Sequence, residues 1–139
     1  MKLPPYVKSK KYIDFLPVLG KSTANAIYPF IFLPEKIFKD LKGANPNPRN
    51  KALLRHEETH RKRQVRQGIF KFWIKYLLNP KFRFNEELMA DIEYMKVIKN
   101  NNLKFNIEKR AKQLSGHLYL WSTNYKKAKN KLEEAWNRK

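Results

Sequence analysis

The chain has 139 residues, of which 42% are hydrophobic and 14% aromatic, and its 31 Lys and Arg against 12 Asp and Glu give a net charge of +19. The aromatic content excludes a wholly disordered chain, the lack of cysteine excludes disulfides and cysteine-ligated zinc fingers, and no run approaches the roughly 18 apolar residues of a membrane span. We therefore expect a single domain over residues 1–139. Its positive charge suggests an anionic partner, and the alternative is a solvated surface that is merely basic.

The first third of the chain combines proline with short apolar runs. Seven of the chain's eight prolines lie between residues 2 and 48, and aromatic or β-branched runs at residues 12–16 and 26–33 predict short strands. Pro29 interrupts the second run and predicts an edge strand there, because proline cannot donate a hydrogen bond to the ladder. The N-terminus lacks the apolar core of a secretory signal, so we expect no cleaved leader.

The remainder of the chain has the periodicity of helices. Apolar spacing, with stops at Gly68, Pro80, the asparagine run 100–102 and Gly116, predicts helices over residues 50–67, 69–78, 85–100, 107–116 and 122–138. Short strands followed by a mainly helical remainder predict the α+β fold class.

Two of these helices have predicted starts. Asn50, in a turn-rich loop over residues 44–50, is expected to cap the first helix, and Ser122 or Thr123 is expected to cap the last. The last helix should bury a stripe at helical spacing, made of Ala128, Leu132, Ala135 and Trp136.

The scarce acidic residues are concentrated in two short segments. Six of the 12 acids lie in them, namely Glu57, Glu58, Glu86, Glu87, Asp91 and Glu93. The first segment is the run His-Glu-Glu-Thr-His at residues 56–60, an H-E-x-x-H pattern on a predicted helix. Residues four apart share a helix face, so His56 and His60 can direct two imidazoles at one zinc ion while Glu57 reaches a water on the metal.

An ordinary charged helix is the alternative for this segment. Glu57 with Arg61 and Glu58 with Lys62 would form favourable ion pairs four residues apart. The buried face of such a helix would then be apolar, made of Leu53, Leu54 and Val65.

The second segment offers a third zinc ligand. Glu87 and Asp91 are also four residues apart on a predicted helix, so Glu87 can reach the metal while Asp91 accepts the free ring N–H of a ligating histidine. The alternative is an exposed acidic helix start, stabilised by the helix dipole. Glu86 and Glu93 fit that alternative.

At these residues the chain resembles the gluzincin metallopeptidases, the zincins that carry H-E-x-x-H on one helix and E-x-x-x-D on a later one. It is also similar to small zincin-like proteins encoded in phage genomes, at residues 53–60, 72–76 and 114–119. The resemblance extends over residues 25–135. It implies a small zincin-like domain that hydrolyses peptide bonds in a peptide or protein substrate.

The resemblance also implies roles for individual residues. His56, His60 and Glu87 would bind zinc, Glu57 would be the general base, and Asp91 would hold a ligating histidine in place. The substrate would add to an edge strand at residues 30–33. A downstream side chain would stabilise the oxyanion, for which Tyr119, His117 and Tyr94 are the candidates.

Two other interpretations remain open. The charge suggests a nucleic-acid-associated protein, or a small H-E-x-x-H protease that acts on DNA-bound proteins, with the basic surface contacting a polyanion. Alternatively, a structural, virion-associated protein would keep the zincin fold with a non-catalytic metal. All of these fit a cytoplasmic or virion-associated location.

Overall fold

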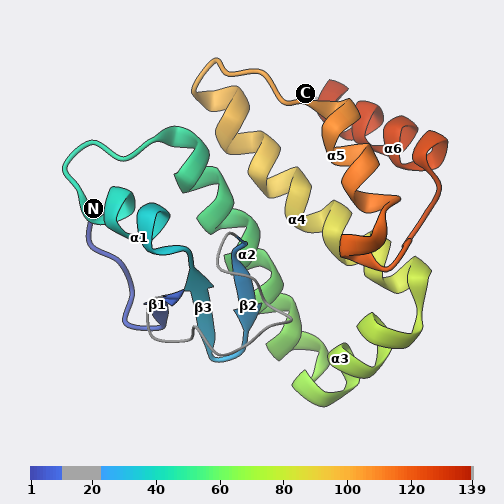
Figure 1. Cartoon of the computed structure of the whole chain (residues 1–139), viewed down its shortest axis with the longest axis horizontal. Coiled ribbons are helices and arrows are strands. Elements are labelled where there is room, and N and C mark those ends of the chain that lie inside the picture. Colours follow the sequence, from blue (N-terminus) through green and yellow to red (C-terminus); the bar gives the residue numbers. More distant parts are fainter. Residues whose placement is uncertain (11–22, 139) are drawn as a thin grey trace.

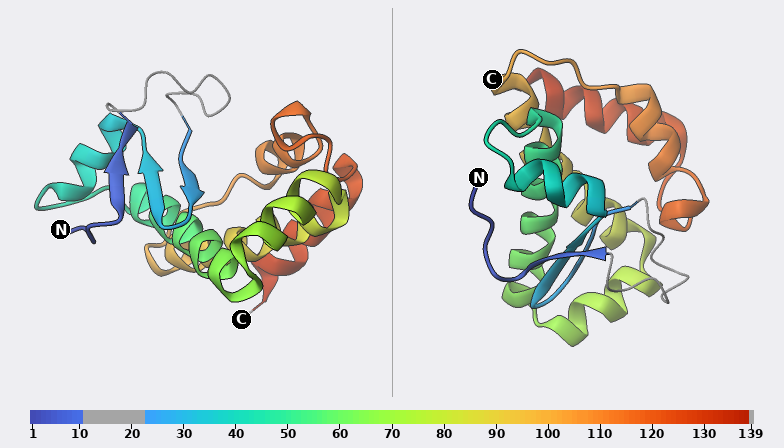
Figure 2. Two further views of the ribbon diagram at one scale, coloured as in Figure 1. Left: turned by 90° about the horizontal axis from the view of Figure 1, so that it is seen from below. Right: turned by 60° about the vertical axis from the view of Figure 1, so that its left-hand side comes forward.

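A computed structural model describes residues 1–10 and 23–138, so the strand expected at residues 12–16 lies outside the described residues. The fold is mixed α+β, as expected: in the described part, three short strands precede six α-helices. Figures 1 and 2 show the sheet and α1 at one end of the molecule and α5 and α6 at the other, with α2 and α4 between them. None of the described helices is both long enough and apolar enough to cross a membrane.

The sheet contains β1 (Val7–Ser9), β2 (Asn25–Ile27) and β3 (Phe30–Leu33) in the order β1-β3-β2. β3 is parallel to β1 and antiparallel to β2. The expectation of one edge strand over residues 26–33 is wrong, because Tyr28 and Pro29 form a turn and residues 30–33 are the central strand. Pro29 lies in the turn, where the sheet needs no backbone N–H donor. Residues 30–33 then pair with β1 on one side and with β2 on the other. Strand addition at β3 is therefore excluded.

Gln64 of α2 covers part of the outer edge of β2. Its side-chain amide donates to the Ala26 carbonyl at 2.7 Å and accepts from the Tyr28 N–H at 2.8 Å. Since β3 lies on the other side of β2, these two backbone groups face away from the sheet. The glutamine thereby attaches the sheet to α2.

The first two helices are α1 (Glu35–Lys42) and α2 (Pro48–Gln67). α1 was not predicted, because it is only eight residues long and has no side-chain cap at its start. α2 begins two residues earlier than expected, because Asn47 caps it and Pro48 occupies its first turn. Asn50 is inside the helix and instead donates to Asp40 at 2.8 Å.

The next two helices are α3 (Ile69–Leu78), as predicted, and α4 (Pro80–Asn100). α4 begins five residues before the expected start at residue 85. Pro80, which was interpreted only as a stop, occupies the first turn of α4, and the side chain of Asn79 accepts from Phe82 N–H. Proline is well suited to this position because its missing N–H would have no partner there.

The last helices are α5 (Ile107–Leu114) and α6 (Tyr125–Asn137), joined by a 3-10 turn at His117–Tyr119. The predicted caps Ser122 and Thr123 are wrong, because Asn124 caps α6. In the expected buried stripe, Ala128 and Leu132 are buried, while Ala135 and Trp136 are partly buried and pack against the same core.

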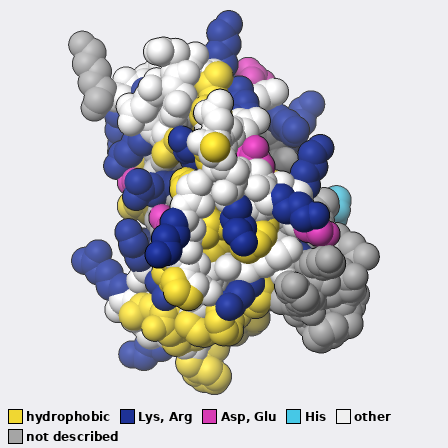
Figure 3. All heavy atoms as spheres, turned by 90° about the vertical axis from the view of Figure 1, so that its left-hand side faces the viewer, with side chains coloured by type: hydrophobic (Ala, Val, Ile, Leu, Met, Phe, Trp, Pro, Cys, Tyr) yellow, Lys and Arg dark blue, Asp and Glu magenta, His cyan; other side chains and the backbone are white. Residues whose placement is uncertain are grey.

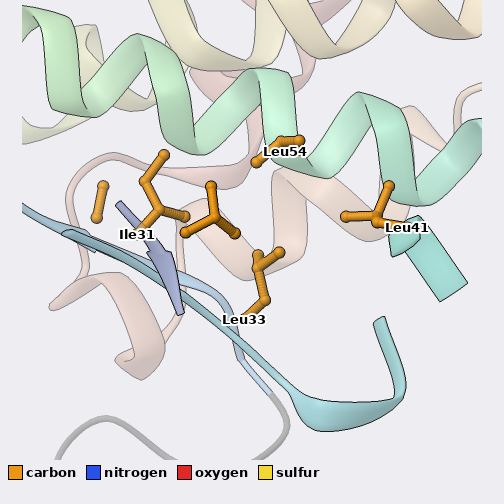
Figure 4. Close-up of a cluster of buried hydrophobic side chains, with 6 residues drawn as sticks. Ile31, Leu33, Leu41 and Leu54 are labelled. Carbon is orange, nitrogen blue, oxygen red and sulfur yellow. The ribbon is translucent and has the colours of Figure 1, made fainter. Parts of the chain in front are cut away.

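Two apolar cores lie on opposite sides of the α2–α4 pair. One joins the sheet to α1 and α2 (Figure 4), through Val7, Ala26, Ile31, Leu33, Leu41 and Leu54. The other joins α4, α5 and α6, through Phe84, Met95, Ala111, Leu114, Ala128 and Leu132. The interface between α2 and α4 therefore lies between these cores.

Arg83 connects α4 to two other segments. This buried guanidinium donates to the carbonyls of Tyr76 and Leu77 at the end of α3, and to those of Tyr119 and Leu120 after α5. It also donates to Ser122 Oγ at 2.7 Å, which explains why Ser122 is buried rather than capping α6. The negative end of the α3 dipole helps to balance the arginine's charge.

Replacing Arg83 with Met should lower the free energy of unfolding by roughly 3 kcal/mol, because several buried carbonyls lose their donor. Denaturant unfolding followed by circular dichroism measures this change. The control is Lys81→Met, an exposed site on the same helix, which should change stability by less than about 0.5 kcal/mol. Equal stabilities for the two variants would contradict this role of Arg83.

Candidate metal centre

The side chains of two neighbouring helices converge between the apolar cores. His56 and His60 come from α2, and Glu87 comes from α4. His60 Nε2 lies 2.8 Å from Glu87 Oε2 and 3.1 Å from His56 Nε2, and His56 Nε2 lies 3.4 Å from the same carboxylate oxygen. All three residues are buried, with at most 7% of their surface exposed. Two histidines four residues apart and a glutamate 27 residues after the second of them thus form one compact group of potential ligands.

The donor set and its spacing fit a zinc ion. Two imidazole nitrogens and one carboxylate oxygen form a common catalytic zinc set, and ligand atoms at tetrahedral angles and bond lengths of about 2.0–2.1 Å stand about 3.3 Å apart. The three distances observed here, between 2.8 and 3.4 Å, are close to that value. Small side-chain movements would therefore accommodate the ion.

Asp91 orients one of the imidazoles. Its Oδ1 lies 3.1 Å from His56 Nδ1, on the side of the ring away from Glu87. If Nδ1 donates its proton to this carboxylate, the lone pair of Nε2 faces the other two ligands. The expected pairing of Asp91 with a histidine ring is thus present in the geometry.

Arg110 of α5 holds both acidic residues of this centre. Its Nε donates to Asp91 Oδ2 at 2.7 Å, and its guanidinium lies 3.6 Å from Glu87 Oε2. A further hydrogen bond runs from Arg110 to Tyr119 Oη at 2.8 Å. A buried cation beside two buried carboxylates offsets part of the cost of removing them from water.

The buried charges shift one another's pKa values. Burial alone would lower the pKa of His56, but hydrogen bonds to Asp91 and Glu87 raise it to about 10. Burial alone would raise the pKa of Glu87, but attraction to His60 and hydrogen bonds from both imidazoles hold it well below its usual range. His56 and Glu87 therefore favour their charged forms beside each other, and a bound cation would replace the proton of the imidazole.

Glu57 is also buried, with 5% of its surface exposed. Burial raises its pKa above the usual carboxyl value, and the neighbouring imidazoles only partly oppose that shift. Among the described residues, none donates a hydrogen bond to its carboxylate. A buried carboxylate with a raised pKa beside potential metal ligands is suited to accept a proton.

The alternative of an ordinary charged helix does not describe α2. Arg61 donates to the Pro29 carbonyl at 2.9 Å and stacks on Tyr6, so it does not form the expected pair with Glu57. No pair between Glu58 and Lys62 occurs among the described residues. The proposed apolar face is also wrong in part, since Val65 is 49% exposed.

Glu86 does not mark an exposed acidic helix start. It lies in the second turn of α4, is only 1% exposed, and accepts two hydrogen bonds from Arg63 and one from Gln67. Glu93 does remain near the surface, where it pairs with Lys96. Glu86 therefore adds a second buried ionic contact between α2 and α4.

The three candidates for oxyanion stabilisation occupy different environments. Tyr119 is linked to the centre through Arg110. Tyr94 packs edge-to-face against Phe105, and His117 is exposed on the 3-10 turn. Among the described side chains, Tyr119 is the only one of these three that is linked to a potential ligand, through Arg110 to Glu87.

Two residues of the centre were not identified from the sequence. Tyr76 of α3 donates to Glu87 Oε1 at 3.0 Å, and burial raises its pKa so that its hydroxyl proton is retained. Its place in the aromatic segment 72–76 was the only available signal. No sequence signal indicated Arg110, because one arginine among 31 basic residues has no distinguishing pattern.

The chain matches no protein-family model, no curated protein and no solved structure. The resemblance to gluzincins therefore stays a prediction. The interpretation of the centre depends on its donor set, spacing and burial.

Zinc should bind at about one ion per chain and raise the melting temperature, because it binds the folded centre and not the dispersed ligands. Metal analysis after dialysis measures the zinc content. Thermal melting with and without chelator measures the change in melting temperature. His60→Ala should abolish binding, whereas His117→Ala should retain it. Failure of the wild type to take up zinc would disprove the metal centre.

Replacing Arg110 with Met should lower the free energy of unfolding of the metal-free protein by about 3 kcal/mol, because two buried carboxylates lose their cation. Lys109→Met, at an exposed site on the same helix, is the matched control and should have little effect. Denaturant unfolding provides the comparison. A neutral effect of Arg110→Met would show that the carboxylates do not need this arginine.

Proposed function

We propose that this protein is a zinc-dependent peptidase whose centre is formed by His56, His60 and Glu87. The observation that carries this proposal is the meeting of those three side chains with Glu57 beside them and Asp91 behind His56. A purely structural zinc site usually has four protein ligands, whereas three ligands leave a position for water or substrate. Within residues 1–10 and 23–138, the group of potential ligands has three members.

Each residue has a distinct role in this proposal. His56, His60 and Glu87 hold the metal, Asp91 holds the His56 ring in one tautomer, and Arg110 limits the negative charge around them. When bound, zinc supplies a Lewis acid that activates water and polarises the scissile carbonyl.

Glu57 transfers the proton. It takes a proton from the attacking water as the new C–O bond forms, and it delivers that proton to the amine as the C–N bond breaks. Its burial favours this role, because a carboxylate with a raised pKa is a stronger base than an exposed one. No oxidant or further reactant is needed.

Tyr119 is the preferred group for stabilising the oxyanion. Its hydroxyl oxygen accepts from Arg110, which leaves the hydroxyl proton free to be donated elsewhere. Burial raises its pKa, so this proton is retained at neutral pH. A fixed donor of this kind is most useful where negative charge develops in the transition state.

Glu57→Gln should keep zinc bound and lower peptide hydrolysis by roughly 10²–10⁴-fold, because the amide cannot accept the proton. Zinc content and cleavage of an unstructured protein substrate are measured on the same preparation. Glu58→Gln is the matched control, since its partly exposed side chain lies next in the sequence and has no assigned role.

Different experimental outcomes would favour the other interpretations. Zinc binding and thermal stabilisation without any hydrolysis would indicate a structural metal. Salt-dependent DNA binding without hydrolysis would favour the nucleic-acid-associated protein. Hydrolysis that persists in Glu57→Gln would show that another group is the base.

A further inference from the structure

One face of α3 is apolar and exposed. Phe70, Ile74, Leu77 and Leu78 are 79%, 45%, 58% and 77% exposed, and their spacing places them along one side of the helix. On the opposite side, Phe72 is buried. The helix is therefore apolar on both sides, and only one of them is covered by the rest of the protein.

The loop before α6 lies beside α3 and also exposes apolar side chains. Leu120 and Trp121 are 50% and 67% exposed. Arg83 holds this loop beside α3, since one guanidinium bonds the carbonyls of both Leu77 and Leu120. We refer to the exposed side chains of Phe70, Ile74, Leu77, Leu78, Leu120 and Trp121 as the apolar end face.

The backbone of this loop is in an unfavourable conformation. Leu120 and Trp121 both have positive φ angles, 52° and 49°, which are rare for bulky residues. The N–H groups of these two residues donate to the carbonyls of His117 and Gly116, which keeps the turn closed. Conformations of this kind persist where surrounding contacts impose them, and they are concentrated at functional sites.

Exposed cations border the α3 stripe on the helix and flank α3 in the sequence. Lys71 and Lys75 lie along one border of the α3 stripe, Lys81 follows the helix, and Lys62 and Arg66 precede it. No Asp or Glu occurs from residue 59 to residue 85. Figure 3 shows hydrophobic side chains gathered at the end of the molecule where α3 lies, with Lys and Arg side chains near them.

We propose that the apolar end face docks on the surface of an anionic phospholipid bilayer, with α3 lying in the interface. Apolar side chains enter the boundary between headgroups and acyl chains, while the surrounding cations contact phosphate and carboxylate groups. A tryptophan at the rim suits this boundary, because its ring is apolar and its N–H is polar.

Charge and shape favour an anionic bilayer as the partner over a nucleic acid or a second copy of the chain. A nucleic acid would contact the cations but would leave Phe70 and Leu78 exposed to water, since phosphates provide no apolar surface. A second copy of the chain would bring two positive rims together, which is unfavourable. A bilayer with acidic headgroups satisfies both the apolar residues and the cations.

The test is sedimentation of the protein with vesicles of phosphatidylcholine containing about 30% phosphatidylserine. The wild type should bind these vesicles and bind pure phosphatidylcholine far less. Phe70→Ser with Leu78→Ser should weaken binding by about tenfold or more, because the inserted apolar area is lost. Met89→Ser, an exposed apolar site on α4, is the control and should leave binding unchanged.

A second set of variants tests the charge. Lys71→Gln with Lys81→Gln should weaken binding by about fivefold for each cation removed. Lys36→Gln with Lys51→Gln removes the same charge from exposed sites on α1 and α2, and should have a much smaller effect. Circular dichroism of each variant verifies that it is folded.

Tryptophan fluorescence tests insertion directly. Anionic vesicles should shift the emission to shorter wavelength, and Trp121→Phe should remove most of that shift. The proposal is overturned if the serine variant binds vesicles as the wild type does. It is also overturned if the wild type is a dimer that the serine variant dissociates, or if the apolar substitutions weaken DNA binding instead.

Discussion

The packing of α2 against α4 depends on buried charge, and the rest of the fold is arranged around that contact. Apolar residues join the sheet to α2 and α4 to α5 and α6, but the centre between these cores contains imidazoles and carboxylates. Buried carboxylates without counter-charges would separate the two helices. Arg63 from α2 and Arg110 from α5 provide those counter-charges. The position of α5 is therefore linked to the electrostatics of the metal centre as well as to apolar packing.

The local part of this arrangement was predictable and the non-local part was not. Side chains four residues apart share a helix face whatever the tertiary structure, so the pairing of His56 with His60 and of Glu87 with Asp91 followed from spacing. That these two faces meet was an expectation from the need for a third zinc ligand and from the family pattern, and the geometry agrees with it. Arg110 comes from a third helix, and no local pattern distinguishes it. The same limit explains the error at Glu86, where partner residues decide whether an acid is exposed.

Errors in the fold prediction have equally specific causes. Pro80 was interpreted as a stop and Pro48 as part of a loop, whereas they lie in the first turns of α4 and α2, each preceded by a capping asparagine. Pro29 was assigned to an edge strand, but it occupies the turn between two strands. The helix α1 was missed because it is short and lies in a region dominated by strand-like signals. Register and strand order depend on contacts with α2, which sequence periodicity does not describe.

Gln64 has a consequence for how the protein behaves at high concentration. The open side of an edge strand can pair with a strand of another molecule, and small sheets are exposed to this form of aggregation. At Ala26 of β2 and at Tyr28, which directly follows the strand, the hydrogen-bonding groups on that side are already satisfied by a side chain of the same chain. Glutamine is suited to this because its amide has the same donor and acceptor as a peptide group. A foreign strand would first have to displace it from a buried position.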